Sequence, residues 1–192
     1  MKSVKHYFIG LQLPQNLKDY LYKEVTLANS ELPFKIWTHR EDFHITLSFL
    51  GEVKNLNEII ELLETFTSNL HSTELILNKV GTFGMEKRPR VFWVGVEKNE
   101  YLLQIQEELA NLLHTRKIKE KETRPFTPHI TIAKKWQGEG KINNLNYNIN
   151  SFKFRIDKIC LFEIQLNELP KYKVVASFNL KDIKGEHYGT TN

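Results

Sequence analysis

Two short segments of the sequence place a histidine two residues before a threonine. Residues 44–47 read His-Ile-Thr-Leu and residues 129–132 read His-Ile-Thr-Ile. In an extended strand, alternate side chains lie on the same face, so each segment would present an imidazole beside a hydroxyl. Two imidazoles can act as acid and base in one reaction, because histidine exchanges a proton near pH ~6.5. We therefore predict that His44 and His129 are catalytic, and that the hydroxyls of Thr46 and Thr131 hold the oxygens of a phosphate.

Strict alternation also predicts which residues face the core. The core-facing apolar set would be Phe43, Ile45, Leu47, Phe49, Ile130 and Ile132. The opposite set would be His44, Thr46, Ser48, His129, Thr131 and Ala133. The two segments lie 85 residues apart, close to half the chain, and each follows a helix-like region and a loop. This coarse repeat indicates two similar lobes related by a pseudo-two-fold axis, with both histidines meeting in one cleft.

Other chemistries have less support. Two histidines could ligate zinc, but no third ligand stands at a suitable spacing. The single cysteine, Cys160, excludes an intrachain disulfide and a cysteine-based zinc cage. No Gly-x-Ser-x-Gly segment is present to carry a nucleophilic serine. We expect neither a metal nor a cofactor.

Hydrophobic periodicity and turn residues outline the elements that would hold these side chains. We expect strands at 4–13, 43–50, 75–80, 91–96, 129–134, 152–166 and 173–180. Helices are expected at 14–30, 55–70 and 99–115, with Asn55 starting the second and Asn99 the third. The glycine-rich, charged stretch 81–90 is predicted to be a loop. Residues 136–150 give only a weak signal, and the tail 184–192 is expected to fray.

Composition excludes several classes of protein. The 192 residues include 27 Lys and Arg against 23 Asp and Glu, a net charge of +4 that permits nucleic-acid binding without requiring it. No apolar run reaches the ~18 residues of a membrane span, so we expect no membrane association. We see no export signal and expect a cytoplasmic protein.

Longer blocks around the two segments resemble a known family. Residues 43–53 (Phe-His-Ile-Thr-Leu-Ser-Phe-Leu-Gly-Glu-Val) and 124–134 (Arg-Pro-Phe-Thr-Pro-His-Ile-Thr-Ile-Ala-Lys) resemble the two HxTx blocks of the 2H phosphoesterase superfamily. Within it, the chain most resembles the RNA 2′,3′-cyclic phosphodiesterases, formerly called 2′-5′ RNA ligases. Residues 89–96 are similar to the family segment that follows a mid-chain loop.

The resemblance implies an α+β, bilobal fold in which two antiparallel sheets flank a central cleft, with helices on the outer faces. We expect one catalytic domain, with lobes of about 1–97 and 98–183. The implied reaction is metal-independent hydrolysis of a 2′,3′-cyclic phosphate at an RNA 3′ end to a 2′-phosphate, reversible in principle as 2′-5′ joining. It makes His44 the proton donor and His129 the proton acceptor. Lys134 stands where many members carry arginine.

Further candidate residues are open to two interpretations. Arg124, Arg90 and Lys134 could contact phosphate or simply be solvated, and Phe126, Trp37 and Phe83 could stack on a base or pack in the core. The expected partners are RNA 3′ ends or nucleotides with a cyclic phosphate, bound by a monomer. Two alternatives stay open: an RNA-binding module without turnover, and a phosphodiesterase acting on 2′,5′-oligonucleotides or small cyclic nucleotides.

Overall fold

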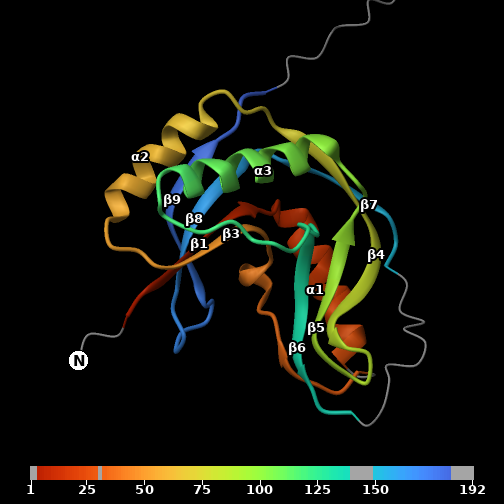
Figure 1. The fold of residues 1–192 in the computed structure, drawn as a ribbon. Coiled ribbons are helices and arrows are strands. Elements are labelled where there is room, and N and C mark those ends of the chain that lie inside the picture. Colours follow the sequence, from red (N-terminus) through yellow and green to blue (C-terminus); the bar gives the residue numbers. More distant parts are fainter. Residues whose placement is uncertain (1–3, 30–31, 139–148, 183–192) are drawn as a thin grey trace, which may run out of the picture.

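The computed structural model describes residues 4–29, 32–138 and 149–182. Within these ranges the chain is an α+β protein whose strands form one antiparallel sheet, as the strand pairings show (Figure 1). The strands are β1 (His6–Gln12), β2 (Phe34–Trp37), β3 (His44–Glu52), β4 (Thr73–Met85), β5 (Arg88–Val96), β6 (His129–Trp136), β7 (Phe152–Ile156), β8 (Lys158–Ile164) and β9 (Tyr172–Asn179). The helices are α1 (Gln15–Asn29), α2 (Leu56–Thr67) and α3 (Glu100–Thr115), with a short 3₁₀ turn η1 (Arg40–Asp42) before β3.

The sheet consists of two half-sheets. Its order is β7-β4-β5-β6-β3-β1-β8-β9, and β2 also pairs with β6. We call β7, β4, β5, β6 and β2 the β4 half-sheet, and β3, β1, β8 and β9 the β1 half-sheet. They meet between β6 and β3, where Ile130 pairs with Ile45. Each half-sheet takes strands from both ends of the sequence.

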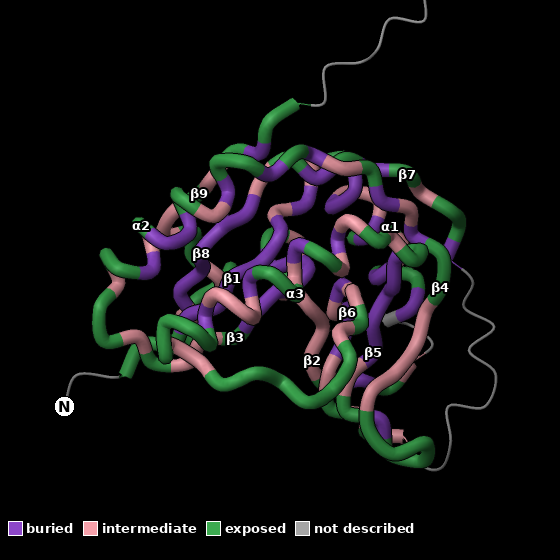
Figure 2. Tube along the Cα trace, turned by 45° about the horizontal axis from the view of Figure 1, so that its top comes forward, coloured by how far each residue is buried: buried purple, intermediate pink, exposed green. Residues whose placement is uncertain are grey.

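The helices pack on one face of this sheet. Buried apolar side chains of α1, α2 and α3 join those of both half-sheets in one core cluster. α2 lies against β9, α3 against β3, and α1 against β2 and η1. Figure 2 shows buried positions concentrated in the central strands and exposed positions in the connections. The opposite face carries His44 and His129, and we call it the histidine face. Within the described residues, none of the helices combines the length and the apolar composition that a membrane span requires.

The expected helices are confirmed, and so are their first residues. The Asn55 side chain accepts a hydrogen bond from the Glu58 N–H at 3.3 Å, and Asn99 accepts from the Leu102 N–H at 2.8 Å. Both are ordinary N-caps. Helix α1 begins directly after Pro14, whose carbonyl accepts from Leu17 and Lys18.

Three expectations about the strands were wrong. The stretch 81–90 is not a loop, since β4 and β5 continue through it to a tight hairpin. Its glycines misled the prediction: Gly81 leaves room for the indole of Trp93, and Gly84, with φ +113°, adjoins a register shift. The expected strand 152–166 is two strands, β7 on β4 and β8 on β1. The short strand β2 was missed because Pro33 suggested a loop. Residues 139–148 and the tail from 183 onward lie outside the described residues.

Candidate active site

The strand pairing brings the two histidine segments together. Ile45 and Ile130 are directly opposite in antiparallel β3 and β6. If that register continued by one residue each way, His44 would lie opposite Thr131 and Thr46 opposite His129. The two histidines would then occupy diagonal positions, which in an antiparallel pair are about 7–8 Å apart, with their Cβ atoms somewhat closer. This spacing suits two rings that reach one phosphate ester from either side.

In β3, the residue after Thr46 is a β-bulge. Gly10 of β1 pairs with Thr46 and Ile9 pairs with Ser48, so Leu47 is the extra residue. The alternation of faces changes there. Ser48 turns inward and is 8% exposed, whereas Phe49 is 49% exposed. The expectation that Phe49 faces the core and Ser48 the opposite side was therefore wrong.

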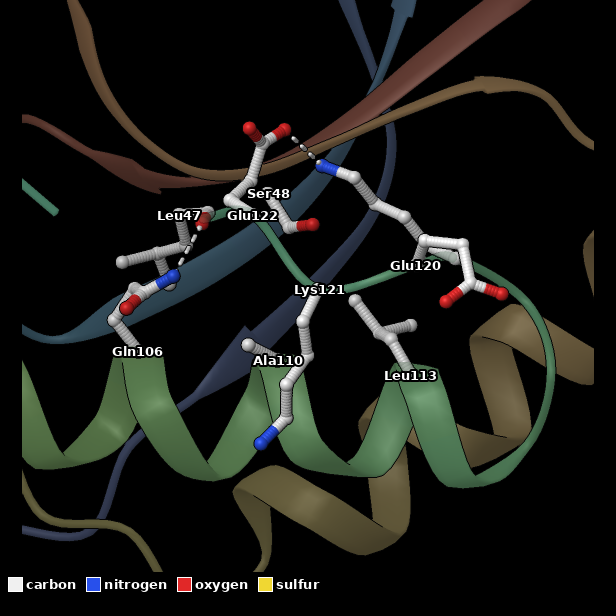
Figure 3. Close-up of a pocket in the computed structure, with 9 residues that line it drawn as sticks. Leu47, Ser48, Gln106, Ala110, Leu113, Glu120, Lys121 and Glu122 are labelled. Carbon is white, nitrogen blue, oxygen red and sulfur yellow. Dashed lines mark hydrogen bonds and ion pairs between the residues drawn. The ribbon is translucent and has the colours of Figure 1, made fainter. Parts of the chain in front are cut away.

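Helix α3 supports this bulge. The amide Nε2 of Gln106 donates to the carbonyl of Leu47 at 3.4 Å, across a small hollow that also contains Ser48 (Figure 3). The bulge breaks the regular ladder, so the Gln106 side chain satisfies a carbonyl that the ladder leaves over.

A matching bulge occurs in β6. Trp93 of β5 pairs with Thr131 and Phe92 pairs with Ala133, so Ile132 is the extra residue. Ala133 therefore turns into the core, where it is fully buried, and the expectation that it shares a face with His129 was wrong. The next pair is Val91 with Lys134, which returns Lys134 to the histidine face. Both His-x-Thr-x segments thus bulge at their fourth residue.

Backbone carbonyls orient both imidazoles in the same way. Nδ1 of His44 lies 2.7 Å from the carbonyl oxygen of Asp42, and Nδ1 of His129 lies 2.7 Å from that of Thr127. A carbonyl can only accept, so Nδ1 carries the proton in each neutral ring and Nε2 is left as the basic atom. In His44, Nε2 accepts from the hydroxyl of Thr46 at 2.9 Å.

Aromatic rings enclose both imidazoles. Phe8 lies 4.6 Å from the His44 ring, centroid to centroid, and Tyr172 stands edge-on to it at 5.0 Å. Phe83 is edge-on to His129 at 4.8 Å, and Trp93 lies 6.1 Å away. Gly10 permits this packing beside His44, because a Cβ there would meet the Ile45 carbonyl at 2.9 Å and the His44 ring at 3.6 Å.

The surroundings favour the neutral form of both rings. Burial lowers the pKa of His44 to about 4, and the positive charges of Lys134 and His129 add to the effect while the Asp42 carbonyl opposes it. Burial, followed by the Lys134 charge, also lowers the pKa of His129 against the opposing bond to Thr127. Burial and then the charge of Lys171 lower the pKa of Lys134, against the opposing charge of Asp42.

Asp42 links this site to the β8–β9 hairpin. Asp42 is 4% exposed, and its carboxylate accepts hydrogen bonds from the backbone N–H groups of Lys171 and Tyr172, each at 3.0 Å. Its carbonyl holds His44, as described above. One residue thus fixes both the ring of His44 and the chain that carries the aromatic neighbour Tyr172.

Not every candidate residue reaches the histidines. The structure gathers Lys134 and Phe83 beside them. Trp37 and Phe126 instead pack against the core cluster, and the Trp37 indole donates to the Phe34 carbonyl at 3.1 Å. Arg124 is 84% exposed and lies 3.8 Å from a Glu122 oxygen. Arg90 is an exposed residue in the irregular β4–β5 pairing near Gly84.

Several residues of the site were not foreseen from the sequence. They are Phe8, Asp42, Phe49, Trp93, Phe162, Lys171 and Tyr172. One of them had a local signal, since Asp42 lies two residues before His44. Among the described residues, no three His, Cys, Asp or Glu side chains are grouped as metal ligands.

Comparison with known proteins gives a consistent family. The sequence model of the 2'-5' RNA ligase superfamily matches residues 24–168. A protein of Geobacillus stearothermophilus named RNA 2',3'-cyclic phosphodiesterase is 34% identical over 180 residues, or 91% of this chain, which spans 57% of that protein's length. A protein of the same name from Bacillus subtilis (strain 168) is 31% identical over 180 residues, covering 91% of this chain and 96% of the relative.

Solved structures share the fold. TT0787 of Thermus thermophilus superimposes with a TM-score of 0.75 at 22% identity, over 95% of this chain and all of that one. LigT of E. coli, crystallised with 3'-AMP, gives a TM-score of 0.72 at 18% identity, over 93% of this chain and 99% of that one. These similarities support the α+β fold.

Proposed function

The chain belongs to the 2'-5' RNA ligase superfamily, and we propose that it is an RNA 2′,3′-cyclic phosphodiesterase. It would hydrolyse the cyclic phosphate at an RNA 3′ end to a 2′-phosphate, without a metal ion. The observation that carries the proposal is the matched pair of imidazoles on adjacent strands, each with Nδ1 on a carbonyl and Nε2 as its basic atom. The curated relatives carry the name of this activity.

The proposed reaction uses both Nε2 atoms. Nε2 of His129 takes a proton from water, whose oxygen attacks phosphorus. The bond from phosphorus to the 3′ oxygen breaks, and that oxygen receives the proton held on Nε2 of His44. The products are a 2′-phosphate and a free 3′ hydroxyl. Each group of this kind typically contributes about 10²–10⁴ to the rate.

A bound phosphate would raise the pKa of His44 and so favour the protonated form that the reaction needs. The free protein holds His44 neutral at pH 7, because its pKa is about 4. A bound phosphodiester brings a negative charge beside the ring, and an opposite charge within about 4–6 Å raises the pKa of an imidazole. Thr46 and Thr131 would donate to the phosphate oxygens, and Lys134 would balance the charge.

Recognition of the RNA end would use the aromatic side chains of the histidine face. Phe49 is half exposed on the strand that carries His44, and Phe83 flanks His129. Either ring can stack on a nucleobase, a contact worth about 1–3 kcal/mol in single-strand recognition.

We also propose that the protein is a cytoplasmic monomer. Size-exclusion chromatography would measure its oligomeric state.

A direct assay tests the function. An RNA oligonucleotide ending in a 2′,3′-cyclic phosphate is incubated with the protein and excess chelator, and the new end is identified by mass and by resistance to a 3′-specific phosphatase. We expect a 2′-phosphate, and a loss of at least about 100-fold in rate for His44→Ala and for His129→Ala. His114→Ala is a matched control, since this histidine pairs with Glu120 at the end of α3.

Other outcomes would identify the alternatives. Inhibition by chelator would favour a metal enzyme. RNA binding without turnover, unaffected by loss of both histidines, would favour a binding module. Turnover restricted to 2′,5′-linked oligonucleotides or small cyclic nucleotides would change the substrate class. Incubating a 5′-hydroxyl RNA with the cyclic phosphate end tests for 2′-5′ joining.

A further inference from the structure

The backbone at Lys171 is anchored close to His44. The Lys171 and Tyr172 N–H groups both bind the buried carboxylate of Asp42, which lies two residues before that histidine. The Lys171 carbonyl accepts from the Gln165 N–H at 2.7 Å, which closes the hairpin. The ring of Tyr172 contacts His44. The position of residue 171 relative to the catalytic pair is therefore set by the hydrogen bonds of its own N–H and its own carbonyl.

The charge of Lys171 has no described counter-charge. Among the described residues, no carboxylate lies within ion-pair distance of Lys171 or Lys134. The Asp42 carboxylate is already engaged by two N–H donors. The positive charge of Lys171 lowers the pKa of Lys134, and the positive charge of Lys134 lowers the pKa of both histidines. Lysines from the two half-sheets thus repel each other beside the catalytic pair.

Two lysine charges that act on each other need more negative charge than one cyclic phosphate supplies. A 2′,3′-cyclic phosphate is a diester with a single negative charge, and Lys134 is positioned to balance it. In an RNA strand the next charge is the internucleotide phosphate on the 5′ side of the terminal nucleoside. A cyclic mononucleotide lacks that group.

We propose that Lys171 binds the internucleotide phosphate that precedes the terminal nucleoside, so that oligoribonucleotides are better substrates than cyclic mononucleotides. The inference rests on the proposed function, and it adds a second phosphate subsite contributed by the β8–β9 hairpin. It also assigns the two lysines separate tasks, with Lys134 on the reacting phosphate and Lys171 on its neighbour.

The test compares two substrates that share the reacting group. The value of kcat/KM is measured for a nucleoside 2′,3′-cyclic phosphate and for a dinucleotide that ends in the same group, at several salt concentrations. We expect the dinucleotide to be preferred by the unmodified protein, and Lys171→Ala to reduce that preference by about tenfold, the scale of one contact to a charged group. The slope of log kcat/KM against log salt for the dinucleotide should become shallower by about 0.7.

Lys173→Ala is the matched control. It removes the same charge two residues further on, where Lys173 is exposed and pairs in register with Glu163. It should keep the preference of the unmodified protein, and Lys171→Arg should retain most of it. Lys171→Gln provides a second neutral variant should the alanine variant fold poorly.

The possible results distinguish a failure of the Lys171 subsite from a failure of the proposed phosphodiesterase function. Turnover of both substrates with an unchanged preference in Lys171→Ala and Lys171→Gln overturns the subsite alone. An equal loss on both substrates also overturns it, because Lys171 would then act at the reacting phosphate. Hydrolysis of neither substrate by the unmodified protein overturns the proposed function together with the subsite.

Discussion

Ile45 of β3 lies directly opposite Ile130 of β6, and both side chains are fully buried. Theirs is the backbone pairing that joins the two half-sheets within the described residues. Because the neighbouring residues alternate to the other face, this core contact determines how the imidazoles of His44 and His129 are placed relative to each other. The distance between two chemical groups on the histidine face is thus set by packing in the core.

The pH dependence of activity should differ between kcat/KM and kcat. In the proposed mechanism, the productive form of the free protein has a proton on His44 and none on His129. Both pKa values lie below about 6.5, so this form becomes scarcer as the pH rises further, and kcat/KM should fall above that pH. The bound phosphate raises the pKa of His44, so kcat should persist to higher pH. Initial rates from pH 4 to 9 measure both profiles.

Lys134→Ala should move the alkaline limb of kcat/KM to higher pH. The Lys134 charge lowers the pKa of both histidines, so its removal raises them. KM should rise as well, because the proposed contact with phosphate is lost. Lys98→Ala, at an exposed site beside Glu100, is the control. If the alkaline limb of kcat/KM were unchanged in Lys134→Ala, this lysine would not affect the pKa values of His44 and His129.

Folding stability should decline in mild acid because of His44. Its pKa is about 4 in the folded state and about 6.5 when unfolded, so the unfolded chain binds the extra proton between these values. The contribution is intact above pH 6.5 and is lost as the pH falls toward 4, by about 2 kcal/mol at pH 5 relative to pH 7. Urea titrations at both pH values should show this loss, and His44→Gln should remove most of it. An equal loss in the variant would assign the effect to other groups.

Asp42→Asn should loosen the β8–β9 hairpin. The buried carboxylate accepts two N–H bonds, and an amide offers one oxygen in their place. Leaving a buried donor without a partner costs about 1–3 kcal/mol. Amide hydrogen exchange at Lys171 and Tyr172 should accelerate, while the Asp42 carbonyl still holds His44. Asp19→Asn is the control, at a half-exposed carboxylate paired with Arg40. Unchanged exchange at residues 171 and 172 would contradict the anchoring role.

Gly81→Ala should displace the indole of Trp93. A Cβ at this position would lie 2.8 Å from Cε2 of the ring and closer still to its outer carbons. Overpacking of this kind costs about 1–3 kcal/mol, and Phe83 and His129 are aromatic neighbours of the ring that would be displaced. We expect lower stability and lower turnover together. In a double-mutant cycle with Trp93→Ala, the two changes should couple, because the smaller side chain removes the clash. Additive effects would mean that the indole is not what the new methyl meets.

The local pattern of the sequence predicted the faces of the first residues of each segment better than those of the residues that follow. Alternation in a strand is a local rule, and it placed His44 beside Thr46 and His129 beside Thr131. The rule failed one residue later in both segments, at Ser48 and at Ala133. A bulge depends on the partner strand, and nothing in the segment itself announces it.

Contacts between distant parts of the chain could not be predicted from the sequence for a different reason. Asp42 and Lys171 are 129 residues apart, and their bond uses a backbone N–H that every residue except proline has. Gly81 shows the converse problem. Glycine usually signals a turn, but here the missing side chain makes room for an indole on the neighbouring strand.

The interleaving of the two half-sheets has a consequence for how the chain assembles. β1 and β3 near the N-terminus must meet β8 and β9 near the C-terminus before the β1 half-sheet is complete. Such sequence-distant pairing slows folding, since long loops close before any contact is gained. A chain cut near its midpoint would give two fragments, neither of which holds a whole half-sheet, and activity should return only when both are mixed.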